Sequence, residues 1–189
     1  MVRDTINRFG QVGIMVTHVG FGPLGRPSEF SDETIMEAME HNFLSAIRLT
    51  REVTPYMKQL RWGRIVHLLP LLHEQMSDGT ALSVSSQLAL VGYSKMLANE
   101  LAPFNITVNN LVLGPVQTEY LTSTLESRAH SQGRSSDEVI NETILGIPIG
   151  RMGKPEEVGD LVAFLGSERA AYLTGTSVVL DGGMLQAIS

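Results

Sequence analysis

The sequence predicts one α/β domain built on a parallel sheet. Apolar runs that end at turn-forming residues are typical of buried strands, and this chain has four of them, at residues 12–19, 63–72, 105–114 and 175–183. Stretches with helical spacing separate these runs. Strands that alternate with helices of this length indicate βαβ units and therefore parallel strands. A length of 189 residues suits a single domain with a sizeable core.

Several helices are predicted from apolar spacing and end signals. Residues 2–9 form a short helix that Gly10 ends. Ser31 is an N-cap for a long helix that extends toward Pro55, with apolar positions at Ile35, Met36, Met39, Phe43 and Ile47. Residues 83–102 form a second long helix, which Pro103 ends.

The last third of the chain has weaker signals. Residues 115–135 are polar and irregular, which indicates a mobile loop. A helix begins near Ser136, which lies close to its N-cap. Residues 154–167 form another helix, with Pro155 in its first turn.

Composition excludes several classes of function. A net charge of −6 gives no basic surface for nucleic acid or anionic membranes. The absence of cysteine excludes disulfides and thiolate zinc sites. No apolar run reaches the roughly 18 residues of a membrane helix, and the polar N-terminus "MVRDTINRFGQ" lacks a signal-peptide core. These observations predict a cytoplasmic protein without nucleic-acid or membrane partners.

Four separated segments occur together in an order that resembles a known family: "HNFLSAIRLTREVTPYM", "WGRIV", "NITVNNLVLGPVQT" and "GRMGKPEEVGDLVAFLGSERAAYLTGTSVVLDGG". They resemble the short-chain dehydrogenase/reductase family, and the tail resembles its 3-oxoacyl-acyl-carrier-protein reductase branch. The resemblance implies a doubly wound, Rossmann-like sheet that binds NAD or NADP. It begins at the helix before the family's fourth strand. The expected fold is therefore a partial sheet over residues 1–189, without the N-terminal dinucleotide-binding segment.

The family's chemistry requires a Tyr and a Lys four residues later, on one helix face. The Lys charge lowers the Tyr pKa from about 10, and a Ser on the preceding strand binds the substrate oxygen. Matched from "GRIV" and "ITVNN", these positions fall on Ser83, Gln87 and Pro70. None of the three can move a proton near neutral pH. The family's relay residue is retained as Asn42, which would otherwise bond a nearby carbonyl within its helix.

Other residues were considered as substitutes for the missing acid and base. Tyr93 and Lys95 are separated by about 200° around the helix, so they face opposite sides. Tyr93 is therefore expected in the core or at an interface. Of His67, His73 and His130, only His67 lies near the family's catalytic positions, in the strand that holds the Ser position. It is either a replacement acid or base or a hydrogen-bonded strand residue. No histidine or acidic cluster indicates a metal site.

Two glycine-containing loops bear on the cofactor. "GFGPLG" spells the G-x-G-x-x-G pattern after a strand, but Pro23 interrupts it and no helix opens on its last Gly. It is either a phosphate loop or an ordinary Gly-rich turn. By resemblance, "MVTHVG" lies where the family has an Asn-Asn-Ala-Gly turn, and only Gly20 matches that turn. "LGPVQT" resembles the family's nicotinamide-binding loop at Gly114, Val116 and Thr118. Its alternative is a strand-ending turn in which Gly114 supplies a special φ angle.

The leading hypothesis is a truncated homologue of an NAD(P)-linked carbonyl or alcohol oxidoreductase, catalytically inactive as it stands, with weak or absent cofactor binding. The alternatives are an active oxidoreductase or cofactor-independent enzyme with a rearranged site, and a binding or regulatory subunit. Halohydrin dehalogenases use this scaffold without a dinucleotide, but their Ser, Tyr and Arg arrangement is absent here. The resemblance also implies a homodimer or homotetramer through the helices at 31–55 and 83–102, or pairing with a related subunit. An unprotected edge at 12–19 would favour further association.

Overall fold

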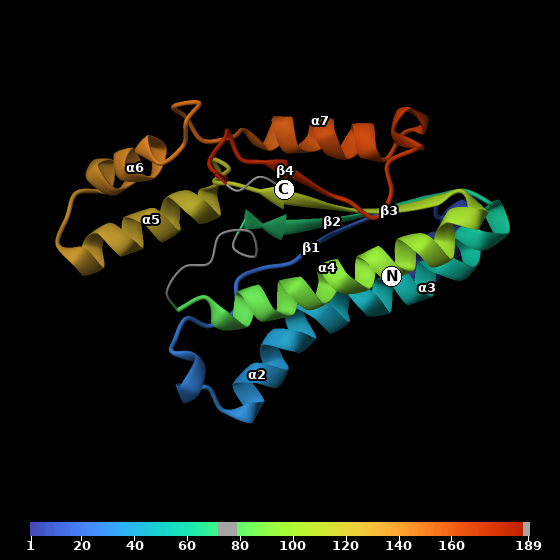
Figure 1. The fold of residues 1–189 in the computed structure, drawn as a ribbon, viewed down its shortest axis with the longest axis horizontal. Coiled ribbons are helices and arrows are strands. Elements are labelled where there is room, and N and C mark those ends of the chain that lie inside the picture. Colours follow the sequence, from blue (N-terminus) through green and yellow to red (C-terminus); the bar gives the residue numbers. More distant parts are fainter. Residues whose placement is uncertain (72–78, 187–189) are drawn as a thin grey trace.

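A computed structural model describes residues 1–71 and 79–186 of the chain. In these residues four strands form one sheet in the order β1-β2-β3-β4, and every neighbouring pair is parallel. The strands are β1 (Ile14–His18), β2 (Gly63–Pro70), β3 (Ile106–Leu113) and β4 (Ser177–Leu180). The predicted α/β fold with a parallel sheet is confirmed (Figure 1).

The main core lies between the sheet and a pair of long helices. Figure 1 shows α3 (Ser45–Leu60) and α4 (Ala81–Leu101) side by side along one face of the sheet. Alternate strand residues such as Met15, Ile65 and Val108 point to these helices and bury themselves against them. The helix α1 (Val2–Phe9), which ends at Gly10 as predicted, joins this core through Val2.

The opposite face of the sheet is covered by α7 (Pro155–Leu165). Leu165 packs with Val66 and Leu111, which point to this side of β2 and β3. The helix begins at Pro155, as predicted, because proline needs no N–H at this position.

The long helix predicted from Ser31 is confirmed at its start but not at its end. Ser31 caps α2 (Asp32–Met39) by accepting a hydrogen bond from the Thr34 N–H. A π-helical turn (Glu40–Leu44) then leads into α3, which continues past Pro55 to Leu60. Proline removes one backbone hydrogen bond but keeps a helical φ. The helix survives because buried residues on either side of Pro55, Val53 and Met57, hold it against the sheet.

The loop predicted at 115–135 is wrong. Residues Glu119–Gln132 form α5, which packs on α6 (Ser136–Leu145). Their small shared core contains Leu125, Ala129 and Val139. The buried side of α5 has one apolar residue per turn, Leu121, Leu125 and Ala129, and the rest of the stretch is largely polar. This weak pattern is why the sequence resembles a loop. The helix α6 begins at Ser136, as predicted, and its cap is the preceding Ser135, which forms a capping box with Glu138.

The remaining predicted helix is α4, which ends at Leu101 and is followed by a short 3-10 turn containing Pro103. Within the described residues, no helix combines the length and the apolar character needed to cross a membrane.

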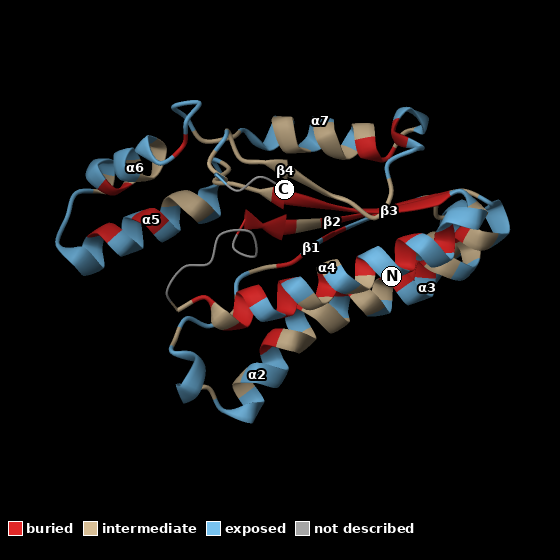
Figure 2. Ribbon diagram, in the orientation of Figure 1, coloured by how far each residue is buried: buried red, intermediate tan, exposed pale blue. Residues whose placement is uncertain are grey.

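The outer strand β1 is covered on only one side. Met15 and Thr17 point to α3 and α4 and are buried, whereas Ile14 and Val16 point to the other face and are 49% and 43% exposed. Figure 2 shows the transition from buried β2 to the largely exposed β1. The Gly13 carbonyl and the Val19 N–H pair with β2. Because alternate residues turn their backbone groups to opposite sides, those of Ile14, Val16 and His18 face the open edge of the sheet.

Candidate active site

The predicted catalytic positions come together near the carboxyl ends of β1 and β2. Ser83 and Gln87 lie one turn apart near the start of α4, and Asn42 lies in the π-helical turn before α3. Pro70 is the last residue of β2. Gly20 follows β1. The carboxyl edge of a parallel sheet is where ligands bind in open α/β folds, so the topology is that of a ligand site.

Asn42 links the end of β1 to α4. Its Oδ1 accepts a hydrogen bond from the Gly20 N–H at 3.1 Å, and its Nδ2 donates to the Ser86 hydroxyl at 3.1 Å. Ser86 in turn donates to the Leu82 carbonyl within α4. Among the described residues, Asn42 thus bonds a backbone N–H and a hydroxyl and not a nearby carbonyl, which was the alternative to a relay. Sequence reasoning missed Ser86, although its spacing of three residues from Ser83 places it on the same helix face.

Ser83 has a structural partner of its own. Its hydroxyl accepts a hydrogen bond from the Gly22 N–H at 2.7 Å, and the side chain is fully buried. Gln87 is also fully buried, but neither its Oε1 nor its Nε2 has a hydrogen-bond partner in the described part of the chain. Leaving a buried amide unpaired costs stability. At the predicted Lys position, Gln87 is therefore an uncharged, buried amide without hydrogen-bond partners among the described residues.

His67 is buried in the middle of the sheet. Its Nδ1 lies 2.6 Å from the Thr17 hydroxyl on the neighbouring strand, and its Nε2 has no partner among the described residues. Burial lowers the pKa of His67 to about 4, because the charged imidazolium would lose its hydration. His67 is thus neutral near pH 7 and shielded from solvent, so it matches a hydrogen-bonded strand residue better than a replacement base.

The row of polar residues around His67 extends across the whole sheet. Thr17, His67, Asn110 and Ser177 are register partners on β1 to β4. The Asn110 Nδ2 donates to the Ser177 hydroxyl at 3.3 Å, whereas its Oδ1 is unpaired within the described residues. An unpaired imidazole nitrogen and an unpaired amide oxygen therefore lie on adjacent strands. The sequence contains these polar residues, but only the register of the strands shows that they lie side by side.

The loop after β3 carries the residues that resemble the family's nicotinamide-binding loop, Gly114, Val116 and Thr118. Val116 pairs with Gly153 in an isolated bridge, and the Thr118 hydroxyl caps α5 by accepting from the Leu121 N–H at 3.2 Å. The predicted reason for Gly114 is wrong, because its φ is not positive. A Cβ at Gly114 would lie 2.7 Å from the Asp181 Cα. Close approach of β4, rather than a special φ angle, requires glycine here.

The "GFGPLG" segment is an irregular loop. After Gly25 the chain enters a three-residue 3-10 helix at Pro27–Glu29, so no α-helix opens on the last glycine, as the phosphate-loop pattern requires. Tyr93 and Lys95 do point in opposite directions. Tyr93 packs edge-on against Phe43 of the π-helical turn, with ring centroids 6.1 Å apart. Lys95 donates to the Gly175 carbonyl at 2.8 Å.

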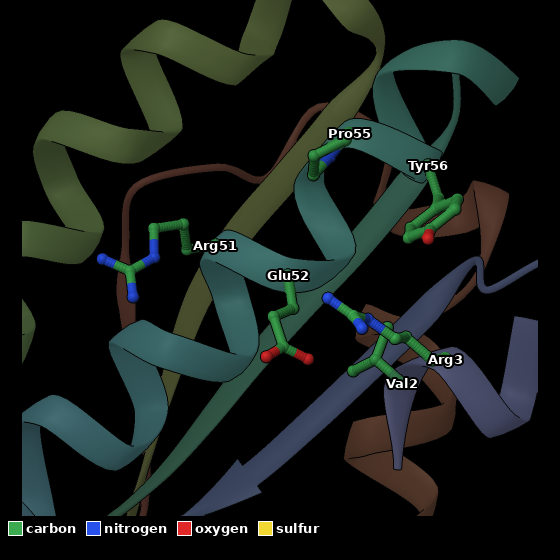
Figure 3. A pocket seen from close by; sticks show the side chains of 6 residues that line it. All are labelled: Val2, Arg3, Arg51, Glu52, Pro55 and Tyr56. Carbon is green, nitrogen blue, oxygen red and sulfur yellow. The ribbon is translucent and has the colours of Figure 1, made fainter.

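Two shallow surface pockets lie away from the predicted catalytic positions Asn42, Pro70, Ser83 and Gln87. One, of about 210 Å³, lies between α1 and α3 and includes Arg3 and Glu52 (Figure 3). The other, of about 320 Å³, lies between α3 and α4 and includes Tyr93 and Lys58. No group of three histidine or acidic side chains that could hold a metal occurs among the described residues. His130 lies on α5, and His73 is outside the described residues.

Comparison with known proteins identifies the family. A family model described as enoyl-(acyl carrier protein) reductase matches residues 1–185. The chain belongs to the short-chain dehydrogenase/reductase family. It is 31% identical over 184 residues to the 3-oxoacyl-[acyl-carrier-protein] reductase of Vibrio cholerae, covering 97% of this chain and 71% of that protein. It is 32% identical over 176 residues to the Escherichia coli reductase of the same name, covering 93% and 68%.

Solved structures agree with the fold. The L-sorbose reductase of Gluconobacter frateurii, described in complex with NADPH and L-sorbose, superimposes with a TM-score of 0.92 at 29% identity. The alignment covers 99% of this chain and 72% of that one. A structure described as a dehalogenation enzyme gives a TM-score of 0.84 at 27% identity. The oxidoreductase family and its 3-oxoacyl-acyl-carrier-protein reductase-like branch are therefore confirmed.

Proposed function

We propose that this chain is a member of the oxidoreductase family that does not itself catalyse NAD(P)-linked carbonyl reduction. The observation that carries the proposal is the state of the Tyr and Lys positions. Ser83 is fully buried and already bonded to the Gly22 N–H, and Gln87 is buried and uncharged. Neither side chain can donate a proton to a carbonyl oxygen or lower the pKa of one that does.

His67 does not supply the missing acid. A general acid needs a pKa near the working pH and contact with the substrate. His67 has a pKa of about 4 and is fully buried, with its Nδ1 engaged by Thr17. General acid–base catalysis contributes about 10²–10⁴-fold. Losing four decades raises the activation free energy by about 5.5 kcal/mol.

We also propose that NAD or NADP binds weakly or not at all. The structural relative that is described in complex with NADPH is longer than this chain, which spans 72% of it. Within this chain, the loop at Gly114, Val116 and Thr118 is shaped for the nicotinamide end of the cofactor by resemblance. Its Thr118 hydroxyl is already used as a helix cap, and no phosphate-binding helix start follows "GFGPLG".

The test is an assay of NADPH-dependent reduction of a 3-oxoacyl thioester and of a simple ketone. The Escherichia coli relative serves as the positive control. We expect no turnover above background from the wild-type chain. We also expect none from the combined variant Ser83→Tyr, Gln87→Lys and Pro70→Ser, because cofactor contacts remain incomplete. Turnover near one per second that is lost in His67→Gln would contradict the proposal, as would a micromolar Kd for NADPH by calorimetry.

A further part of the proposal concerns self-association. Leu88 and Met96 are exposed on α4, and the open edge of β1 carries exposed Ile14 and Val16. Exposed apolar side chains next to unpaired strand backbone favour association. We propose that a second copy of this chain packs against α3 and α4, with additional contact at the β1 edge. Light scattering at micromolar concentration should give a mass above 20.6 kDa, and a stable monomer would contradict it.

A further inference from the structure

The segment that follows β1 crosses directly over the catalytic positions. Residues 20–25, here called the strap, leave the end of β1 and run to the start of α4. Three glycine N–H groups tie the strap down: Gly20 to Asn42 Oδ1 at 3.1 Å, Gly22 to Ser83 Oγ at 2.7 Å and Gly25 to the Gly79 carbonyl at 3.0 Å. The strap is thus attached to the rest of the molecule at both ends and in the middle.

The middle contact leaves no room above Ser83. A Cβ built on Gly22 would lie 3.4 Å from the Leu82 Cβ and 3.4 Å from both the backbone nitrogen and the hydroxyl of Ser83. The strap backbone therefore rests on the first turns of α4 in van der Waals contact. Ser83 is completely inaccessible to solvent beneath it.

The strap is held by these hydrogen bonds and not by buried side chains. Phe21 is 56% exposed and Leu24 is 73% exposed, so the two large apolar side chains of the strap contribute little burial. Segments with few buried apolar contacts open at low free energy. Glycines at positions 20, 22 and 25 also give the open strap many accessible conformations.

We propose that the strap closes the family's catalytic position in this chain, and that the Ser83 hydroxyl is the group that holds it closed. The side chain at position 83 then serves as a backbone acceptor where the chemistry of the family requires a proton donor. A ligand that reaches Ser83 must first displace the strap, so its apparent affinity is reduced to the fraction of molecules in which the strap is open.

The inference stands apart from the proposed lack of activity, because its test measures backbone opening and not turnover. Amide exchange of the isotope-labelled wild-type chain, followed by NMR, should show protection at Gly20, Gly22 and Gly25. In Ser83→Ala the exchange of Gly22 should accelerate about tenfold, which corresponds to the loss of one ordinary hydrogen bond. Gly20 should stay protected, because its acceptor is Asn42.

The matched control is Ser94→Ala. Ser94 is a buried serine of the same helix whose hydroxyl donates to the Leu90 carbonyl of that helix, so its loss should leave strap exchange unchanged. A second variant, Ser83→Tyr, should release the strap by bulk, exposing both Gly22 and Gly25 while amides of β2 and β3 remain protected. Equal Gly22 exchange in wild type and Ser83→Ala would overturn the proposal. Unprotected strap amides in the wild type would overturn it without any variant.

Discussion

Two parts of the buried interior are built on opposite principles. Around the second half of α4, the residues Leu97, Ala98 and Leu101 pack with Ile65 and Val108 into a purely apolar cluster. Around its first half, buried Ser83, Ser86 and Gln87 lie among buried Leu82, Val84 and Leu90, and both polar atoms of the Gln87 amide lack hydrogen-bond partners among the described residues. We call the second half the apolar half and the first half the polar half. The apolar half is organised for stability, whereas the polar half buries hydrogen-bonding groups beside the end of β1.

The largest effect is expected from damage to the apolar half. Leu101→Ala should lower the free energy of unfolding by about 3 kcal/mol, because Leu101 is fully buried and its truncation leaves a cavity. Chemical denaturation measures the change. The control Met96→Ala, at a position 69% exposed on the same helix, should change stability by less than about 0.5 kcal/mol. Equal losses of stability in the two variants would mean that α4 does not pack on the sheet through Leu101.

The buried polar side chains should make the free energy of unfolding depend on pH. The folded-state pKa of His67 is about 4, below the 6.5 of an ordinary histidine. The unfolded chain therefore binds a proton between these values while the folded chain does not. The stability contributed by neutral His67 is fully present above pH 6.5 and is lost as pH falls toward 4, by about 3 kcal/mol in all.

The measurement is the denaturation midpoint at several pH values. Relative to wild type, His67→Gln should flatten the profile between pH 6.5 and 4, since glutamine does not titrate and still offers Thr17 a partner. Exposed His130 provides the control, and His130→Gln should leave the slope unchanged. An unaltered slope in His67→Gln would show that His67 is solvated.

A smaller effect of opposite sign is expected at Gln87. Gln87→Met replaces two unpaired polar atoms by an apolar side chain of similar length and should raise stability by about 1 kcal/mol. The exposed helical residue Gln59 supplies the control, and Gln59→Met should be close to neutral. A destabilised Gln87→Met variant would indicate that bound water satisfies the Gln87 amide in the wild type. The two halves of α4 would then differ less in how well their buried groups are satisfied.

The sequence by itself determined the architecture and predicted which side chains stand at the family's catalytic positions. Apolar runs bounded by turn residues located all four strands, and cap residues such as Ser31 and Pro155 located helix starts, because these signals act between near neighbours in the chain. The motif spacing also placed Ser83, Gln87 and Pro70 at the family's catalytic positions. The same local reasoning failed at α5, whose narrow stripe becomes meaningful only against α6.

Only the tertiary structure decided which contacts the side chains at these positions make. The Gly22–Ser83 contact joins residues 61 positions apart, and the Thr17–His67 contact joins residues 50 apart. No periodicity or cap signal encodes such pairs, because they depend on how β1, β2 and α4 meet. Burial follows from the same packing. It sets the low pKa of His67 and leaves Gln87 unpaired, and both are properties of the surroundings and not of the residue type.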